Sequence, residues 1–191
     1  AEVHALRQAG DLTRGATAYV TLEPCSHTGK TPPCANALIE AGVAEVICAM
    51  VDPNPQVAGQ GLACLQAASI HTAHGLLGEQ AQALNRGFLS RIQRKRPFLT
   101  LKLAASLDGK TALANGDSQW ITGAAARADV HKERAARNAI ITGSGTVLAD
   151  NPQLNVRGVA CLKQPVRVVL DRHLRSPATA QIFDTSLAPT W

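Results

Sequence analysis

Apolar residues recur at helical spacing in some segments of the first half of the chain and alternate at strand spacing in others. Val3 and Leu6, for example, lie on one face of a predicted helix that ends at Gly10, a residue suited to helix termination. The elements predicted in this half are a helix over 1–9, a strand over 16–22, a helix over 34–42, a strand over 43–51, a helix over 61–68, a strand over 70–73 and a helix over 79–92. This alternation predicts an α/β fold with a mainly parallel sheet.

A cluster of basic residues from Arg91 to Arg96 ends at Pro97, which cannot continue a helix. We therefore predict a domain boundary here, with one domain over 1–95 and a second over 96–191. The second domain again has an α/β pattern. Its predicted elements are a strand over 98–104, a helix over 124–137, a buried strand over 139–142 and a strand over 166–170.

The composition is that of a globular protein, with 46% hydrophobic residues in 191. No apolar run is long enough for a membrane span, and no secretory leader opens the chain, so a cytoplasmic location is predicted. Because Ala1 stands inside a helical pattern, the chain is expected to be an internal piece of a longer protein. The net charge of +5 favours an anionic small molecule, whereas three Phe, one Tyr and two Trp offer little stacking surface for nucleic acid.

Five cysteines are an odd number for a disulfide framework, which favours metal ligation together with buried thiols. Cys25 follows a predicted strand and Cys34 begins a predicted helix, where a thiolate is favoured. With Glu2, they supply much of a catalytic zinc site. The third ligand would be a histidine just before Ala1, because zinc deaminases carry His-x-Glu ahead of their cysteines. We expect packing roles for the other three cysteines, Cys48, Cys64 and Cys161.

Zinc lowers the pKa of bound water, and Glu2 could pass the released proton to a leaving ammonia, which is hydrolytic deamination. A simpler alternative is that Glu2 is a solvated helix residue and the cysteines are core thiols. His27 could also be a fourth ligand, which would close the site and make it structural, although an exposed loop histidine suits substrate contact as well.

Several strings resemble the bifunctional family of riboflavin biosynthesis that joins diaminohydroxyphosphoribosylaminopyrimidine deaminase to 5-amino-6-(5-phosphoribosylamino)uracil reductase. In the first half these strings are AEVHAL at 1–6, YVTLEPCSH at 19–27, TPPC at 31–34 and DPNP at 52–55. In the second half they are LKLAASLDGK at 101–110, SQWIT at 118–122 and GTVLADNP at 145–152. The resemblance covers nearly the whole chain.

For the first domain, the resemblance implies a cytidine-deaminase-like α/β/α fold that lacks its start. It would deaminate a phosphorylated ribosylaminopyrimidine, with Cys25 and Cys34 on zinc and Glu2 moving protons. The implied substrate contacts are His27, Lys30, Asp52 and Asn54. A lysine suits a phosphate as a point charge, whereas Asp-Pro-Asn-Pro is also ordinary turn chemistry.

For the second domain, the resemblance implies the first part of a dihydrofolate-reductase-like α/β domain that reduces the ribosyl group with NADPH. The implied NADPH contacts are Ala104, Trp120, Thr146, Asp150 and, less directly, Arg172, because relatives often place a small or polar residue there. The implied substrate contacts are Ser118, Arg134, Leu154 and Arg157. From the residues alone, Gly143 to Thr146 resembles a tight loop more than a dinucleotide fingerprint.

Two rival interpretations remain. One is another zinc deaminase, acting on a free base, nucleotide or RNA adenosine, although the nine-residue cysteine separation is unusual for it. The other is a non-catalytic structural zinc module that binds a partner through its basic linker. The family also implies self-association. Since its later glycine-rich cofactor loop has no counterpart here, we expect neither activity from the chain alone.

Overall fold

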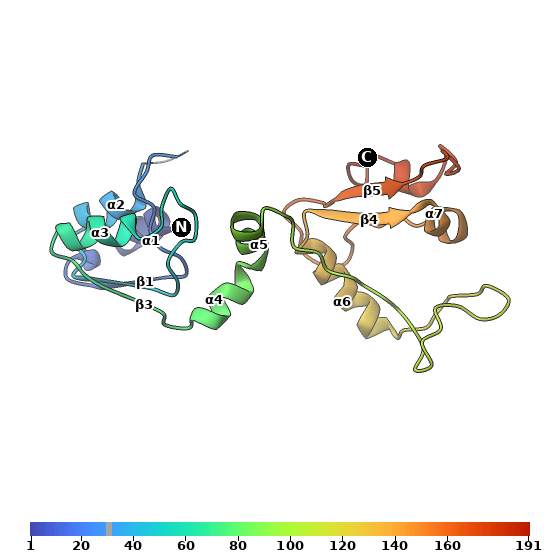
Figure 1. Cartoon of the computed structure of the whole chain (residues 1–191), viewed down its shortest axis with the longest axis horizontal. Coiled ribbons are helices and arrows are strands. Elements are labelled where there is room, and N and C mark those ends of the chain that lie inside the picture. Colours follow the sequence, from blue (N-terminus) through green and yellow to red (C-terminus); the bar gives the residue numbers. More distant parts are fainter. Residues whose placement is uncertain (30–31) are drawn as a thin grey trace. The chain divides into compact units, whose positions relative to one another are not determined.

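Two parallel sheets organise the chain, one in each of two units, and the computed structural model describes residues 1–29 and 32–191 (Figure 1). Unit 1 comprises Ala1–Leu101 and unit 2 comprises Lys102–Trp191. The predicted α/β class is confirmed in both units. The domain limits at 95 and 96 stay a prediction.

Unit 1 is built on a sheet of order β1-β2-β3, all parallel. Its elements are, in chain order, α1 (Glu2–Ala9), the 3-10 helix η1 (Gly10–Thr13), β1 (Thr17–Val20), α2 (Cys34–Glu40), β2 (Glu45–Cys48), α3 (Gln60–Ala67), β3 (His71–His74), α4 (Gly78–Leu84) and α5 (Arg86–Arg94). Helices α1, α2 and α3 lie over one face of this sheet (Figure 1).

The core of unit 1 lies between the sheet and these helices. Val46 of β2, Leu38 of α2 and Leu65 of α3 are almost fully buried in one cluster, against which Leu6 of α1 packs. Side chains alternate along a strand, so the face that carries Val46 is covered, whereas Tyr19 of β1 is 67% exposed. The helices therefore hold the sheet from one side and leave its carboxyl edge to the loops that carry the predicted site residues.

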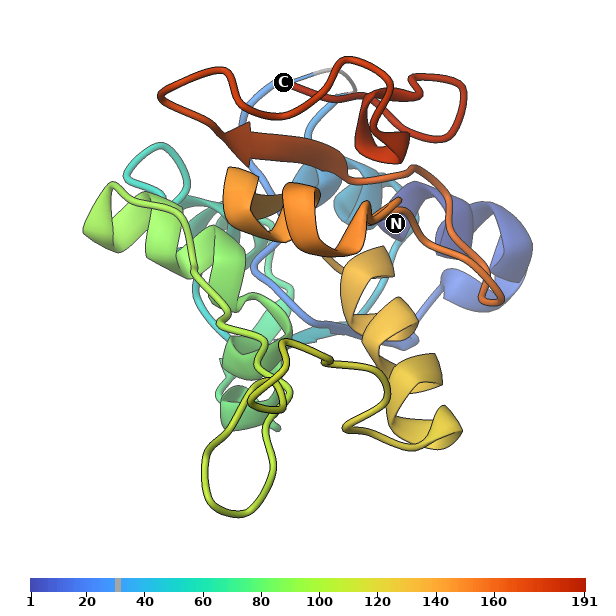
Figure 2. The same ribbon diagram turned by 90° about the vertical axis from the view of Figure 1, so that its right-hand side faces the viewer.

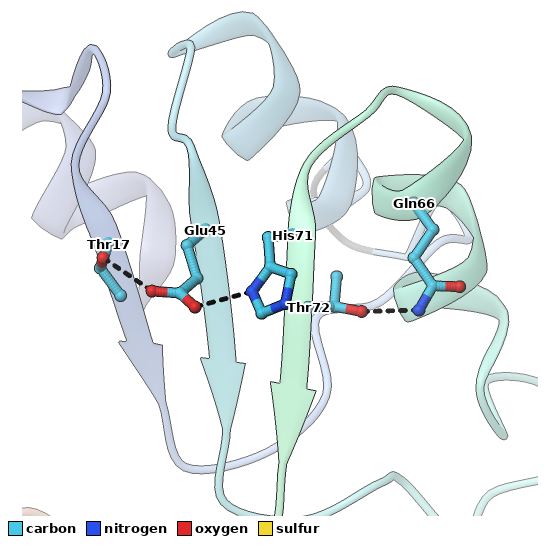
Figure 3. A network of polar contacts seen from close by, with 5 residues as sticks. All are labelled: Thr17, Glu45, Gln66, His71 and Thr72. Carbon is cyan, nitrogen blue, oxygen red and sulfur yellow. Dashed lines mark hydrogen bonds and ion pairs between the residues drawn. The ribbon is translucent and has the colours of Figure 1, made fainter.

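A row of polar side chains crosses the amino ends of the three strands (Figure 3). Thr17, Glu45 and His71 are register partners on β1, β2 and β3. The Thr17 hydroxyl donates to Glu45 Oε2 at 3.0 Å, and His71 Nδ1 lies 2.7 Å from Glu45 Oε1. This row links the strands at the edge opposite to Cys25, because parallel strands all run the same way.

The Glu45 carboxyl is expected to titrate below its ordinary value. The hydrogen bonds from His71 and then Thr17 lower its pKa because they favour the ionised form. A lowered folded-state pKa stabilises the fold above the unfolded-state pKa, and this contribution disappears as the pH falls through the folded-state value. A carboxyl NMR titration should therefore show a higher midpoint in His71→Phe.

Thr72→Val is the matched control for this titration, because it removes only the neighbouring hydrogen bond between Gln66 and Thr72. Its Glu45 midpoint should equal that of the original chain. An unchanged midpoint in His71→Phe would contradict the assignment.

Unit 2 contains a parallel pair of strands, β4 and β5, in which Ile140 is the register partner of Arg167. Its elements are α6 (Ala124–Ala135), β4 (Ala139–Gly143), α7 (Ser144–Asp150), β5 (Val166–Leu170) and the 3-10 helix η2 (Gln181–Phe183). The segment after β5 returns along that strand (Figure 2). Thr190 makes an isolated bridge with Arg167, and Ile182 is buried beside Val147 of α7.

Arg167 is fully buried in β5, and its hydrogen bonds hold the segment after β5 against that strand. Its guanidinium donates to three backbone carbonyls, those of Gln153 at 2.8 Å, Asp184 at 2.7 Å and Ala188 at 2.6 Å. Burial lowers its pKa, as expected for a cation removed from water. A residue that the alternating pattern would place on a strand therefore acts as a buried cross-link.

Four predicted features differ in the structure. The helix expected over 79–92 is two helices, divided at Asn85, whose side-chain amide donates to the Ala81 carbonyl as part of the break. Residues 98–104 form no strand, since none of the described strands pairs with them, and Leu101 is 83% exposed. The strand over 139–143 is present but not buried, with Ile141 58% exposed. The turn at Gly143 starts helix α7.

Candidate functional site

Cys25, Cys34 and Glu2 converge in unit 1 although they come from three separate segments. Cys25 lies in the loop after β1, Cys34 is the first residue of α2 and Glu2 is the first residue of α1. The Cys34 backbone N–H donates to Cys25 Sγ at 3.4 Å, and the Cys34 thiol donates to Glu2 Oε2 at 3.3 Å. The Ala35 N–H also donates to the Cys25 carbonyl at 3.1 Å, so Cys25 is held against the start of α2.

The protonation states in this group follow from burial and from the mutual contacts. Burial raises the pKa of the Cys34 thiol to about 12, and Glu2 and Cys25 add to the rise. The predicted helix-terminus effect is thus outweighed, and the thiol is protonated. Burial alone would raise the pKa of Glu2, but its backbone N–H and the Cys34 thiol donate hydrogen bonds that lower it. The site pairs a carboxylate with a thiol that donates to it.

The donor set suits zinc, which binds cysteine sulfur and, in catalytic sites, keeps an open position. A coordinating thiol is deprotonated, so a divalent cation would reverse the preference for the Cys34 proton. Within residues 1–29 and 32–191, no three His, Cys, Asp or Glu side chains are arranged to hold a metal.

Glu23 organises this end of the sheet, although the sequence analysis gave it no role. Its carboxylate is 4% exposed and accepts four backbone N–H groups, two from the loop after β2 and two from the first turn of α3. Oε2 accepts from Asp52 at 3.1 Å and Gly59 at 2.9 Å, and Oε1 accepts from Gly61 at 2.9 Å and Leu62 at 3.3 Å. The sequence feature that could have indicated this role is the position of Glu23, two residues before Cys25. Glu23 ties the cysteine loop to the loop after β2 and to the start of α3.

The predicted substrate contacts of unit 1 have different surroundings. Asp52 is 8% exposed and accepts the Asn54 N–H at 2.8 Å, while Asn54 Oδ1 accepts the Gln56 N–H at 3.3 Å. Both side chains therefore support a turn of the Asx type, and the turn chemistry considered for this string is present. His27 is exposed in the loop after Cys25. Lys30 lies outside the described residues.

Arg134 and Arg157, the two arginines predicted on the substrate side of unit 2, lie close together. Arg134 on α6 donates to the Asn155 carbonyl at 3.1 Å. Arg157 donates from Nη1 to Gln153 Oε1 at 2.8 Å and to Asn155 Oδ1 at 2.6 Å. Burial lowers the pKa of Arg134, and the positive charge of Arg157 adds to the effect. In the part of the chain that the structure describes, neither guanidinium has a carboxylate partner at ion-pair distance.

The other predicted residues of unit 2 are distributed over its loops and α7. Thr146 and Asp150 are exposed and one turn apart on α7, and Trp120 is 69% exposed with the Arg127 guanidinium 4.3 Å from its ring centre. Leu154 packs against the cluster of Val147 and Ile182. The remaining predicted residues lie in irregular segments, where Ala104 and Ser118 are half-buried and Arg172 is exposed. Unlike the two arginines, these residues form no common cluster of hydrogen bonds.

Comparison with known families assigns both parts of the chain. Residues 1–50 match the cytidine and deoxycytidylate deaminase zinc-binding region, and residues 97–191 match the RibD C-terminal domain. Among residues 1–29 and 32–191, no helix has the length and hydrophobicity needed to cross a bilayer.

Similar proteins carry one name. The riboflavin biosynthesis protein RibD of Bacillus amyloliquefaciens is 52% identical over 191 residues, which are all of this chain and 52% of that protein. The Escherichia coli RibD is 56% identical over 187 residues, covering 92% of this chain and 51% of that protein. The chain thus spans about half the length of these curated relatives.

Two solved structures are also similar to the chain. Acinetobacter baumannii RibD, form 1, has a TM-score of 0.89 at 53% identity. The match covers 95% of this chain and 52% of the Acinetobacter chain. A deaminase/reductase of Thermotoga maritima, described as diaminohydroxyphosphoribosylaminopyrimidine deaminase/5-amino-6-(5-phosphoribosylamino)uracil reductase, has a TM-score of 0.90 at 42% identity. The match covers all of this chain and 53% of the Thermotoga chain.

Proposed function

Because the chain belongs to the RibD family of riboflavin biosynthesis proteins, we propose that it carries residues of two successive reactions. Unit 1 serves the zinc-dependent hydrolytic deamination of 2,5-diamino-6-(5-phosphoribosylamino)pyrimidin-4-one. Unit 2 serves the NADPH-dependent reduction of the ribosyl to the ribityl side chain. A cytoplasmic location and self-association stay predictions.

The observation that supports the first activity is the convergence of Glu2, Cys25 and Cys34. Cys25 and Cys34 would hold zinc, which supplies the Lewis acidity that activates water near neutral pH. Glu2 is ionised in this surrounding and can hold a proton at Oε2, where it now accepts the Cys34 thiol. From there a proton can be delivered to the amino group that leaves as ammonia. Asp52 and Asn54 would border the pyrimidine, on the loop that Glu23 ties to Cys25.

The pair of Arg134 and Arg157 supports the second activity. Two guanidiniums that pair with no carboxylate among the described residues suit an anion, and a phosphate ester can accept from both. We place the phosphate of the substrate there, with Ser118 and Leu154 further along it. NADPH would contact Ala104, Trp120, Thr146, Asp150 and Arg172 and would supply the hydride.

Metal binding tests the first part of this proposal. Titration with Co²⁺, whose thiolate complexes absorb strongly, should give a charge-transfer band that Cys25→Ser and Cys34→Ser each weaken and that Zn²⁺ removes. Because a ligand thiol must lose its proton, affinity should rise with pH, by about tenfold per pH unit for the proton of Cys34. This direction follows from the raised pKa of Cys34.

Cys64→Ser is the matched control for the metal titration, since Cys64 is half-buried on α3 and packs against the core of unit 1. It should leave the band unchanged. A band of equal strength in Cys34→Ser would contradict the proposed metal site.

A further inference from the structure

Two hydrogen bonds hold the loop over 153–157 against helix α6, one to a backbone carbonyl of the loop and one from a backbone N–H of the loop. Arg134 of α6 donates to the Asn155 carbonyl at 3.1 Å, and His131 Nδ1 accepts the Arg157 backbone N–H at 3.1 Å. His131 and Arg134 are three residues apart, so they lie on one face of the helix. One side chain therefore binds a carbonyl of the loop while its neighbour binds an N–H of the same loop.

The loop is held from its other side by Gln164. Its side-chain carbonyl accepts the Val156 N–H at 2.8 Å, and its amide donates to the Val156 carbonyl at 3.0 Å. Asn155 and Val156 are 6% and 5% exposed. The backbone N–H and carbonyl of Val156 are thus both satisfied by the Gln164 side chain. The next residue, Arg157, is held instead by the hydrogen bond from its backbone N–H to His131.

The other basic residues of α6 show by contrast why Arg134 stands apart. Lys132 Nζ lies 3.6 Å from Asp129 Oδ1, and Arg137, two residues beyond the end of α6, pairs with Glu133. Arg127 instead lies over the Trp120 ring. Arg134 has only the Asn155 carbonyl as a partner in the part of unit 2 that the structure describes. The helix thus offers one guanidinium to an external anion, next to the point where Arg157 emerges.

We infer that His131 is a positioning residue for the anion site of Arg134 and Arg157, a role that rests on the function proposed for unit 2. Its Nδ1 lone pair receives the Arg157 N–H, so the ring proton is on Nε2 and the ring is neutral. Burial lowers the pKa of His131 and the charges of Arg134 and Arg157 add to this, while a hydrogen bond with the Asn155 backbone opposes it, so the net effect favours that neutral form. The ring fixes where Arg157 leaves the loop and so fixes the spacing of the two guanidiniums.

The test measures the affinity of the chain for ribose 5-phosphate, with ribose as the ligand that lacks the phosphate. Arg134→Ala and Arg157→Ala should each lose at least about tenfold in affinity, because each removes a charged donor. His131→Leu removes the acceptor and should lose roughly five- to tenfold, the effect of one hydrogen bond. His131→Asn places Oδ1 where Nδ1 lies and should stay within about twofold of the original chain.

His173→Leu is the matched control, because His173 is an exposed histidine of unit 2 in the loop after β5. It should bind ribose 5-phosphate as the original chain does, and melting curves of every variant establish that unit 2 is folded. Unchanged affinity in His131→Leu, or equal losses in His131→Leu and His131→Asn, would overturn the positioning role and leave the proposed function standing. If the original chain binds ribose 5-phosphate no better than ribose, the anion site of the proposed function fails, and the role of His131 fails with it.

Discussion

Glu23→Ala is expected to remove a large part of the stability of unit 1. Four backbone N–H groups, those of Asp52, Gly59, Gly61 and Leu62, would lose their acceptor at a place closed to water. Each unsatisfied buried donor costs about 1–3 kcal/mol, so we expect a loss of about 4 kcal/mol or more in the free energy of unfolding. Domains of this size are stable by only about 5–15 kcal/mol in total.

Chemical denaturation followed by circular dichroism measures this loss, and two further variants make it specific. Glu23→Gln keeps the shape but turns an amide NH₂ toward N–H donors, so its loss should be intermediate, about 2 kcal/mol. Glu40→Ala, at the exposed end of α2, should change stability by less than about 0.5 kcal/mol. If Glu23→Ala proved as stable as Glu40→Ala, the Glu23 carboxylate would not organise these segments.

Gly61→Ala should be the second most damaging substitution, for a reason of space rather than of backbone conformation. A Cβ at Gly61 would lie 1.8 Å from the Pro24 carbonyl oxygen and 3.2 Å from Glu23 Oε1. Because the nearest atom belongs to the backbone, it cannot rotate away, and the Pro24–Cys25 segment must shift. Overpacking costs about 1–3 kcal/mol where side chains can move, so we expect at least about 3 kcal/mol here.

Gly87→Ala provides the matched control, since Gly87 also lies in a helix of unit 1 and a Cβ there meets nothing within 4 Å. Alanine is the better helix former, so this variant should gain about 0.5–1 kcal/mol. Gly61→Ala should also weaken the Co²⁺ band, because the shift moves Cys25. A stable Gly61→Ala with an unchanged band would mean that α3 and the cysteine loop are less closely packed than the structure shows.

Glu23 and Gly61 lie at one junction, at which three segments far apart in sequence meet. The loop after β1 supplies Glu23 and Cys25, the loop after β2 supplies Asp52, and α3 begins at Gln60 with Gly61 against Pro24. Parallel strands bring such loops to one edge of the sheet, where sites of α/β proteins usually lie. The Glu23 carboxylate and Gly61 determine how closely these three segments pack at that edge.

Local chemistry made several elements predictable. The ends of α1 before Gly10 and of α2 before Gly42, and the start of α2 after Pro33, follow from residues close together in sequence. The alternation of helices and strands along the chain likewise predicted a parallel sheet, whereas the order of the strands came only from the structure. The deaminase motif was likewise visible, because Cys25, Cys34 and Glu2 are reactive residue types in a recognisable order. Such signals need only neighbouring residues, so the chain displays them before it folds.

Pairing and burial could not be predicted in the same way. Residues 98–104 have the apolar alternation of a strand but pair with none of the described strands, and strand hydrogen bonds require a partner. Arg167 appears in a strand pattern as an ordinary polar position, yet it is fully buried and binds three carbonyls. Its surroundings come from the segment after β5, which local periodicity cannot position.

The sequence by itself determined the α/β class, the candidate zinc ligands and the resemblance to a deaminase joined to a reductase, because residue type and spacing carry that information. Only the tertiary structure decided that Glu23 binds the loop after β2 and the start of α3, that Gly61 must lack a side chain and that His131 receives the Arg157 amide. Each of these depends on distances between segments 26 to 38 residues apart. Such distances are set by how sheets and helices pack, and no pattern along the chain records them.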